Sequence, residues 1–294
     1  MDTSSKQDNF KLRFELEHID CLYRYRCLDA EGRNLQALDE CRLYFSVPKN
    51  FNDPYDTLLF ADSNQIVLNI LQRLGKLVPS IDDAEGVVDD IYKYVTGLKL
   101  LIRKNVKLIC FSEVYDSMLM WSHYADSHKG FALMYDLDSF ANAKCFTSTG
   151  QEYEGDVLFG AVEYVERQLD LTQTSEDVAF SCLLSERYPE LASDFKIDVG
   201  QLLAAIRQKR EEWHYEKEWR LLAIMDNLDE PSPAQYLEVK PSGVILGSHC
   251  FNEAAEKIIA AAQRQDIHVY RMFLDEFDPT FPLRIGEGIG ARIV

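Results

Sequence analysis

The chain has 294 residues, 47% of them hydrophobic, so it can bury a sizeable core and fold as one large domain or two small ones. Its formal net charge of −18, from 31 basic and 49 acidic residues, repels bulk nucleic acid. Small molecules and proteins are therefore the expected partners, although the acidity also fits a simple need for solubility.

The seven cysteines form no CxxC pair, which predicts reduced and mostly buried thiols. The first ten residues lack the basic start and apolar core of a signal peptide. No apolar run reaches the 18 or more residues of a membrane span, so no membrane association is expected. These features predict a soluble, cytoplasmic protein.

A short strand is predicted at residues 21–26, after a polar leader over residues 1–20. Alternation along this strand places Arg24 and Arg26 on one face, opposite two tyrosines. Their planar guanidinium groups are suited to binding a phosphate or carboxylate. Two solvated surface arginines would give the same pattern.

A second strand, at residues 42–47, is predicted to lead into a polar loop over residues 48–56. Ser46 lies near the end of the strand, and the Asn-Asp-Pro sequence containing Asn52 and Asp53 forces a turn. These side chains can contact a substrate, or Asn52 and Asp53 can serve the turn alone.

Two helical insertions are expected, near residues 65–105 and 175–213, and the first is expected to cover the sheet. No repeat and no linker rich in proline or glycine divides the chain. Residues 21–294 are therefore predicted to form a single α+β domain with a mixed, largely antiparallel sheet.

Residues 118–136 concentrate polar aromatic side chains between two predicted strands, at residues 106–111 and 131–135. A short helix is expected to begin after a cap at Asp116 or Ser117. Trp121 is predicted to be buried against Met118 and the following strand.

His123 and Tyr124 exceed what a hydrophobic core needs, which indicates a site. His123 and His128 are five residues apart, so on a helix they would point about 140° away from each other. This geometry is poor for one ion, and the sequence has no HExxH motif or Cys/His cluster, so no metal site is predicted.

Residues 215–225 alternate charged and aromatic residues and then become apolar, as for a strand entering the core. Alternation would place Glu216 and Glu218 on one face. One carboxylate, preferably that of Glu218, would face a cleft while Arg220 holds it ionised. The alternative is an exposed strand on which both glutamates form ordinary salt bridges.

Four separated segments, LYRYR, LYFSVPKNFNDPYD, CFSEVYDSMLMWSHYADSHKGFALMYD and WHYEKEWRLL, occur in this order. They resemble a bacterial domain family of unknown function, whose members carry an FNDP turn, an MW-HYA--H-G segment and an E-EWR strand. The resemblance extends over residues 21–284 and brings no established reaction with it.

A weaker resemblance is to the ADP-ribosyltransferases, in the order of an early basic strand, a strand end with serine and a late Glu-x-Glu pair. The resemblance implies that Arg24 or Arg26 holds the ribose or amide of NAD and that Ser46 builds the pocket floor. It also implies that Glu218 or Glu216 stabilises the ribosyl oxocarbenium ion. The usual first motif of that family is not clearly present.

The leading functional hypothesis is therefore an NAD-using ADP-ribosyl or glycosidic transfer, in a toxin or phage-defence setting, with a nucleotide ligand and a possible protein partner. One alternative is a phosphodiester or phosphate-transfer enzyme that uses the two arginines and His123. Another is a non-enzymatic ligand-sensing or protein-binding module. The predicted site residues should line one cleft, with catalytic roles for Glu218, Glu216 and His123 and binding roles for Arg24, Arg26, Ser46, Asn52, Asp53, Tyr124 and Arg220.

Overall fold

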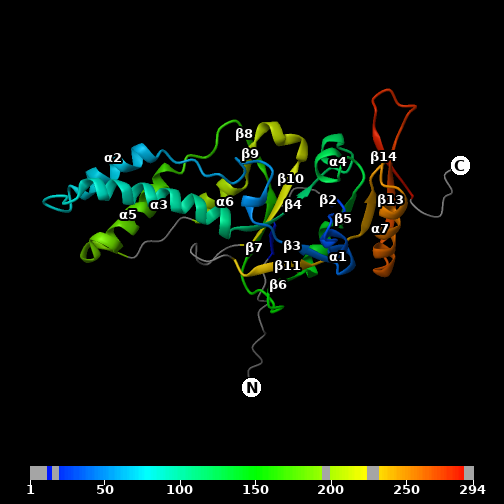
Figure 1. Cartoon of the computed structure of the whole chain (residues 1–294), viewed down its shortest axis with the longest axis horizontal. Helices are drawn as coiled ribbons and strands as arrows, with labels where there is room; N and C mark the ends of the chain where they lie inside the picture. The colour runs from blue at the N-terminus through cyan, green and yellow to red at the C-terminus, as the bar shows by residue number, and fades with distance from the viewer. Residues whose placement is uncertain (1–11, 15–19, 194–198, 224–231, 288–294) are drawn as a thin grey trace, which may run out of the picture.

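The computed structural model describes residues 12–14, 20–193, 199–223 and 232–287. Its centre is a nine-stranded sheet in the order β1-β7-β10-β4-β2-β5-β12-β13-β14 (Figure 1). The pairs β1–β7 and β12–β13 are parallel and the other neighbours are antiparallel, so the predicted α+β class with a mixed, mostly antiparallel sheet is confirmed. In sheet order the strands are Leu12–Phe14, Val157–Ala161, Glu218–Ala223, Lys107–Ser112, Cys21–Arg26, Phe131–Asp136, Gly243–Leu246, His268–Leu274 and Leu283–Glu287.

A three-stranded sheet of β3 (Arg42–Tyr44), β11 (Ala234–Glu238) and β6 (Lys144–Thr147) packs against the main sheet. The largest apolar cluster joins the two sheets to α7 (Asn252–Arg264). Helix α7 buries alanine and isoleucine side chains at the three- and four-residue spacing of a helix face. Helix α1 (Arg33–Asp39) packs beside α7.

Helix α4 (Met118–Tyr124) begins at Ser117, whose side chain accepts a hydrogen bond from the backbone N–H of Met120. Trp121 is buried, as predicted, and its indole N–H donates to the carbonyl of Tyr115. Its apolar neighbours include Met120 rather than Met118, which is 49% exposed because it lies on the outer face of the helix.

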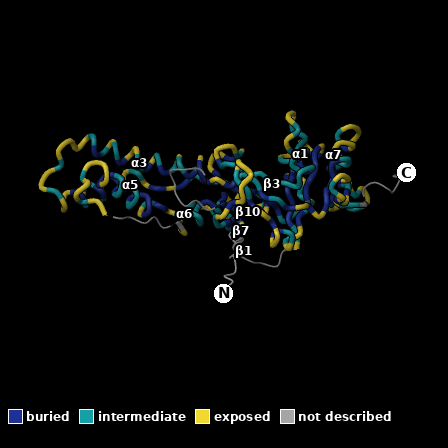
Figure 2. The backbone as a smooth tube through the Cα atoms, turned by 90° about the horizontal axis from the view of Figure 1, so that it is seen from below, coloured by how far each residue is buried: buried dark blue, intermediate teal, exposed yellow. Residues whose placement is uncertain are grey.

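The helical segments form a lobe of their own, made of α2 (Ser63–Leu74), α3 (Ala84–Asn105) and α5 (Thr172–Arg187). Figure 1 shows this helical lobe extending away from the sheet. Buried residues line its interior and exposed residues its outside (Figure 2). The expectation that the first insertion covers the sheet is therefore met only in part. The apolar faces of the three helices pack mainly on one another, and only the C-terminal end of α3, through Leu98 and Ile102, packs near Leu108 of β4 and Leu222 of β10.

The second helical insertion ends earlier than predicted. After α6 (Val199–Ile206), the chain forms β9 (Gln208–Arg210), which pairs with β8 (Glu163–Val165), and then a 3₁₀ segment, Glu211–Glu216. Residues 194–198 of that insertion lie outside the described part of the chain.

Within the polar leader predicted for residues 1–20, the structure places strand β1 and does not describe residues 1–11 and 15–19. All seven cysteines are free thiols, but only Cys145 and Cys250 are buried. The prediction of mostly buried thiols is thus wrong, since the other five lie at partly exposed positions.

The main sheet opens between its two central strands, β2 and β4. Their register contains a single pair, Tyr23 with Ser112. Farther along, Leu108 of β4 pairs instead with Ser46, in an isolated bridge. The two strands therefore diverge, and β4 is bridged at both ends of a gap. This gap positions the candidate site.

Candidate functional site

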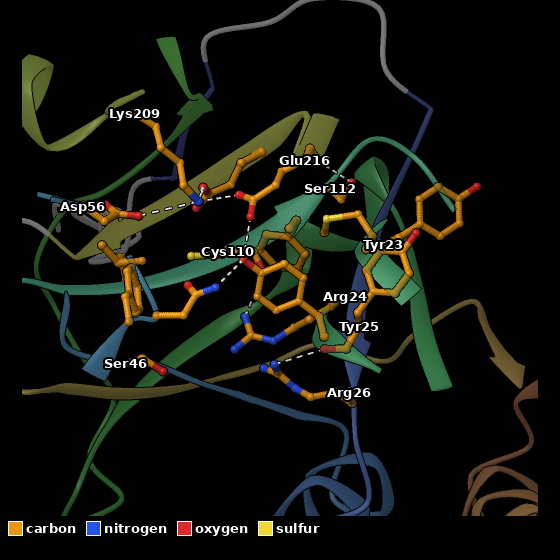
Figure 3. Close-up of a pocket in the computed structure, with 17 residues that line it drawn as sticks. Tyr23, Arg24, Tyr25, Arg26, Ser46, Asp56, Cys110, Ser112, Lys209 and Glu216 are labelled. Atoms are coloured by element: carbon orange, nitrogen blue, oxygen red, sulfur yellow. Dashed lines mark hydrogen bonds and ion pairs between the residues drawn. The ribbon is translucent and has the colours of Figure 1, made fainter. Parts of the chain in front are cut away.

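The opening between β2 and β4 is a pocket of about 180 Å³ (Figure 3). It draws residues from segments far apart in the chain: β2, the loop after β3, β4, helix α4, β9 and the turn before β10. The lining residues with polar side chains that could contact a ligand are Arg24, Arg26, Ser46, Asn52, Asp56, Tyr124, Lys209, Glu216 and Glu218.

Arg24 occupies the gap itself. Its guanidinium donates to the carbonyl of Cys110 on β4 at 3.3 Å and to the carbonyl of Tyr44 at 3.4 Å. Although Arg24 is only 6% exposed, its Nε has no hydrogen-bond partner. Arg24 thus replaces some of the missing strand pairing and retains an unused donor.

Arg26 lies one pleat farther along β2 and donates to the carbonyl of Tyr25 at 3.3 Å. Burial lowers the pKa of its guanidinium, because the charged form loses hydration. Within the described ranges, neither Arg24 nor Arg26 forms an ion pair with a carboxylate. This end of the pocket therefore carries uncompensated positive charge.

Strand β5 begins so close to the end of β2 that only a glycine fits at residue 130. A Cβ atom on Gly130 would lie 2.1 Å from the carbonyl oxygen of Arg26. The glycine lets β5 begin directly beside the end of β2, where Arg26 pairs with Phe131.

The opposite end of the pocket is a buried network of three carboxylates and two cations. Arg220 donates to both carboxylate oxygens of Glu218, at 2.8 and 3.1 Å, and to Asp56 at 2.7 Å. Lys209 contacts Glu218 at 3.0 Å, Asp56 at 3.6 Å and also Glu216. All five side chains are at most 6% exposed. The network has one more carboxylate than cations.

The pKa values of the two glutamates in this network are shifted in opposite directions. Burial raises the pKa of Glu216, since the neighbouring cation only partly compensates the lost hydration. Glu218 is also buried, but the charges of Arg220 and Lys209 outweigh that desolvation and hold its pKa well below the usual range. Such a divergence is typical of carboxylate pairs with different roles, one exchanging protons and one remaining ionised.

Helix α4 contributes Tyr124, whose hydroxyl donates to Oε1 of Glu216 at 2.5 Å. The side-chain amide of Asn52 donates to the Tyr124 oxygen at 3.2 Å. Asn52 belongs to the Asn-Asp-Pro loop, so this contact connects the loop, the helix and the acidic network.

The pocket brings together most of the predicted site residues, namely Arg24, Arg26, Ser46, Asn52, Tyr124, Glu216 and Glu218. Three others do not line it. Asp53 is buried in its turn, where it accepts from the N–H of Tyr55, as the turn interpretation predicts. Arg220 lies behind Glu218 with no exposed surface. The roles of all these residues in catalysis or binding remain predictions.

His123 also lies outside the pocket lining, although it follows the same helix as Tyr124. It is exposed, and its ring centroid lies 6.3 Å from that of Tyr215. A helix presents successive residues about 100° apart, so when Tyr124 faces Glu216 its neighbour His123 points elsewhere. The prediction that His123 lines the same cleft as Glu218 is therefore wrong.

The strand prediction for residues 215–225 needs correction at its beginning. Strand β10 starts at Glu218, whereas Glu216 ends the 3₁₀ segment and Lys217 has a left-handed backbone, with φ 42°. The two carboxylates nevertheless converge, because both contact Lys209. They do not form the exposed salt bridges of the alternative interpretation. Residues 224–225 lie outside the described part of the chain.

Sequence reasoning missed Lys209 and Asp56. Lys209 falls in a segment expected to be helical, and Asp56 is one of several polar residues in its loop. A lysine and an aspartate are common surface residues, and neither has a local pattern that signals burial. The only sequence signal for Lys209 was that the carboxylates of the Glu-x-Glu pair, if buried, would need cations beside them.

The pocket also contains the thiol of Cys110, whose pKa burial raises well above its usual value, so this cysteine is not an activated nucleophile. Among the described residues there is no group of three or more His, Cys, Asp or Glu side chains that could hold a metal ion. None of the described helices is long and apolar enough to span a membrane.

Comparison with known proteins gives a match to one family model. Residues 120–221 match the family model described as protein of unknown function (DUF2971). The chain matches no curated protein and no solved structure. The matched segment contains the last five residues of α4, strands β5, β7 and β9, and the first four residues of β10. It thus includes Tyr124, Lys209, Glu216 and Glu218 of the pocket. Residues 120–221 are therefore similar to this domain family of unknown function.

Proposed function

We propose that the pocket binds an NAD-type nucleotide and breaks its N-glycosidic bond, transferring the ribosyl group to water or another acceptor. The supporting observation is the distribution of charge inside one pocket. Uncompensated guanidinium groups lie at one end, and a carboxylate network with excess negative charge lies at the other. A substrate with an anionic group and a developing cation fits this arrangement.

At the cationic end, Arg24 and Arg26 would bind a phosphate of the nucleotide. Guanidinium groups bind phosphate through parallel N–H donors, and the bond is strong where water is excluded. The unpartnered Nε of Arg24 is a donor that such a ligand could use. In the absence of a ligand this donor carries a desolvation cost without a compensating hydrogen bond.

At the acidic end, Glu216 and Glu218 would stabilise positive charge on the ribose. Cleavage of an N-glycosidic bond builds an oxocarbenium-like transition state, and fixed carboxylates favour that state over the ground state. Because Arg220 orients Glu218 from behind and Lys209 lies between the two glutamates, the carboxylates are already positioned and need little reorganisation.

The size of the pocket limits which part of the substrate lies inside. Its volume of about 180 Å³ slightly exceeds the roughly 150 Å³ of an engineered cavity that holds one benzene molecule. A nicotinamide-sized ring or a ribose fits this space, whereas an intact dinucleotide must extend outside. We therefore propose that the glycosidic bond lies at the pocket mouth near Glu216.

The experiment is to incubate the purified protein with NAD and measure nicotinamide release, with binding measured by calorimetry. Glu216→Gln should lower the cleavage rate by a factor of about 100 or more, as for loss of other fixed groups that stabilise transition-state charge. Arg24→Gln should weaken NAD binding by roughly tenfold, because one charge-assisted hydrogen bond is lost. Glu253→Gln, on the exposed face of α7, is the matched control and should change neither quantity.

Glu216 is a sharper test than Glu218, because Glu218→Gln also leaves Arg220 without its bidentate partner and endangers the fold. Wild-type protein that neither binds nor cleaves NAD would contradict the proposal. Binding without cleavage would instead support the non-enzymatic sensor. The phosphate-transfer alternative loses support because its third residue, His123, lies outside the pocket lining. An NAD-consuming activity would also fit a toxin or phage-defence setting.

A further inference from the structure

The Tyr124 hydroxyl occupies an unusual position among the polar groups of the pocket. It donates to Oε1 of Glu216 at 2.5 Å, and its oxygen accepts from the amide of Asn52 at 3.2 Å. An oxygen that donates its proton inward to a carboxylate keeps a lone pair for a donor arriving from the pocket. The side chain is only half-buried, so such a donor can reach it.

Two other polar groups of the pocket cannot serve this purpose. Tyr25 directs its hydroxyl to the carbonyl of Val114, at 2.7 Å. Lys209 is an ammonium held by three carboxylates, which raise its pKa, so it has no lone pair to offer. Of the described hydroxyl groups that line the pocket, that of Tyr124 is the one bonded to a carboxylate.

We propose that Tyr124 is a catalytic residue that relays the proton of the attacking acceptor to Glu216. This inference rests on the proposed function and extends it, because it assigns the acceptor side of the reaction. It also implies that the preferred acceptors carry a removable proton, as water, alcohols and amines do. The path from acceptor to Tyr124 oxygen to Glu216 Oε1 needs no further protein group.

The step balances without another reactant. The bond between ribose C1′ and the nicotinamide nitrogen breaks, and its electron pair neutralises the cationic ring, which leaves without needing a proton. The acceptor oxygen or nitrogen forms the new bond to C1′ and gives its proton to the Tyr124 oxygen. The phenolic proton passes at the same time to Glu216, which later releases it to solvent.

Chemical rescue tests this relay. Azide is a nucleophile with no proton to lose, so it does not need a base. In Tyr124→Phe, which keeps the ring and removes the hydroxyl, NAD hydrolysis should fall by a factor of about 100 or more. Formation of the azide adduct, measured by mass spectrometry, should stay within about threefold of wild type. NAD binding should also stay within that range, because the proposed phosphate-binding arginines, Arg24 and Arg26, are untouched.

Tyr270→Phe is the matched control, since it removes a phenolic hydroxyl from the same apolar cluster outside the pocket, and it should leave both reactions unchanged. If hydrolysis and azide transfer fall equally in Tyr124→Phe, Tyr124 is a positioning residue and the relay is overturned. Unchanged hydrolysis overturns it as well. Wild-type protein inactive with both nucleophiles would overturn the proposed function and the relay with it.

Discussion

The helical lobe and the pocket region are stabilised in opposite ways. The helical lobe buries apolar side chains from α2, α3 and α5 and has ion pairs at its surface, as with Arg187 and Asp83. Its one buried carboxylate among the described ion pairs, Glu176, binds the partly exposed Arg73 at 2.8 Å. The pocket region buries three carboxylates, the ammonium of Lys209, the guanidinium of Arg220 and one further arginine, Arg24, beside a gap in the sheet.

Burial of charge is costly even when the charges are paired, because the ions lose hydration that their mutual attraction only partly restores. An arrangement of this kind contributes less to stability than apolar packing would. The comparison therefore indicates that the helical lobe is optimised for folding, whereas the pocket region retains groups suited to binding and chemistry.

The largest expected effect in this comparison comes from removing one ion from the buried network. Arg220→Leu leaves Glu218 and Asp56 without their shared guanidinium and should lower the free energy of unfolding by about 3–5 kcal/mol. Arg187→Leu, in the helical lobe, removes a surface guanidinium and should cost far less. Urea denaturation of both variants measures the difference, and equal losses would abolish the distinction between the two regions.

A cavity in the helical lobe should have the next largest effect on stability, but none on the site. Ile70→Ala removes a fully buried side chain between the helices and should cost about 2–4 kcal/mol. Because the helical lobe has its own apolar cluster and extends away from the sheet, NAD binding to the folded variant should match wild type. A large change in affinity would show that the helical lobe and the pocket are coupled.

Helix caps allow a comparison at equal stability cost. Ser117→Ala removes the cap of α4, and Asp62→Ala removes the cap of α2, where the carboxylate accepts from two backbone N–H groups. Each should cost about 1 kcal/mol. Only Ser117→Ala should also weaken NAD cleavage, because α4 carries Tyr124. If both variants, or neither, affect cleavage, α4 has no special role in positioning that residue.

The smallest expected effects are opposite dependences of stability on pH. The folded-state pKa of Asp83, in the helical lobe, is lowered by its bonds to Arg187 and the N–H of Gly86. Its contribution is therefore present above the unfolded value near 3.8 and is lost as pH falls through the folded pKa. The folded pKa of Glu216 is raised, so folding binds a proton above the unfolded value near 4.5. The contribution of Glu216 to folding stability therefore declines as pH rises from about 4.5 to its folded-state pKa.

Urea midpoints measured from pH 3 to pH 8 test these signs. The stability difference between wild type and Asp83→Asn should grow as pH rises through the acid range. The difference between wild type and Glu216→Gln should shrink as pH rises above about 4.5. The same direction in both variants would refute the assignment of Glu216 as the carboxyl that exchanges protons.

Much of the local structure follows from the sequence alone. Periodicity identifies the strand at residues 21–26 with its observed bounds, since side-chain patterns reflect which face of an element is buried. The sequence narrows the cap of α4 to Asp116 or Ser117, because capping depends on residues adjacent in the chain, and the structure selects Ser117. The same local logic identified Arg24, Tyr124 and Glu216 as chemically unusual residues.

Only the tertiary structure decided which of these residues meet. The gap between β2 and β4 arises because the edge of β4 pairs with Ser46 at one end and Tyr23 at the other, and no local pattern encodes that divergence. Lys209 becomes buried because three carboxylates from other segments surround it. His123 faces away because of how α4 docks on the sheet. Such placement depends on long-range packing and electrostatics, which act between residues distant in the sequence.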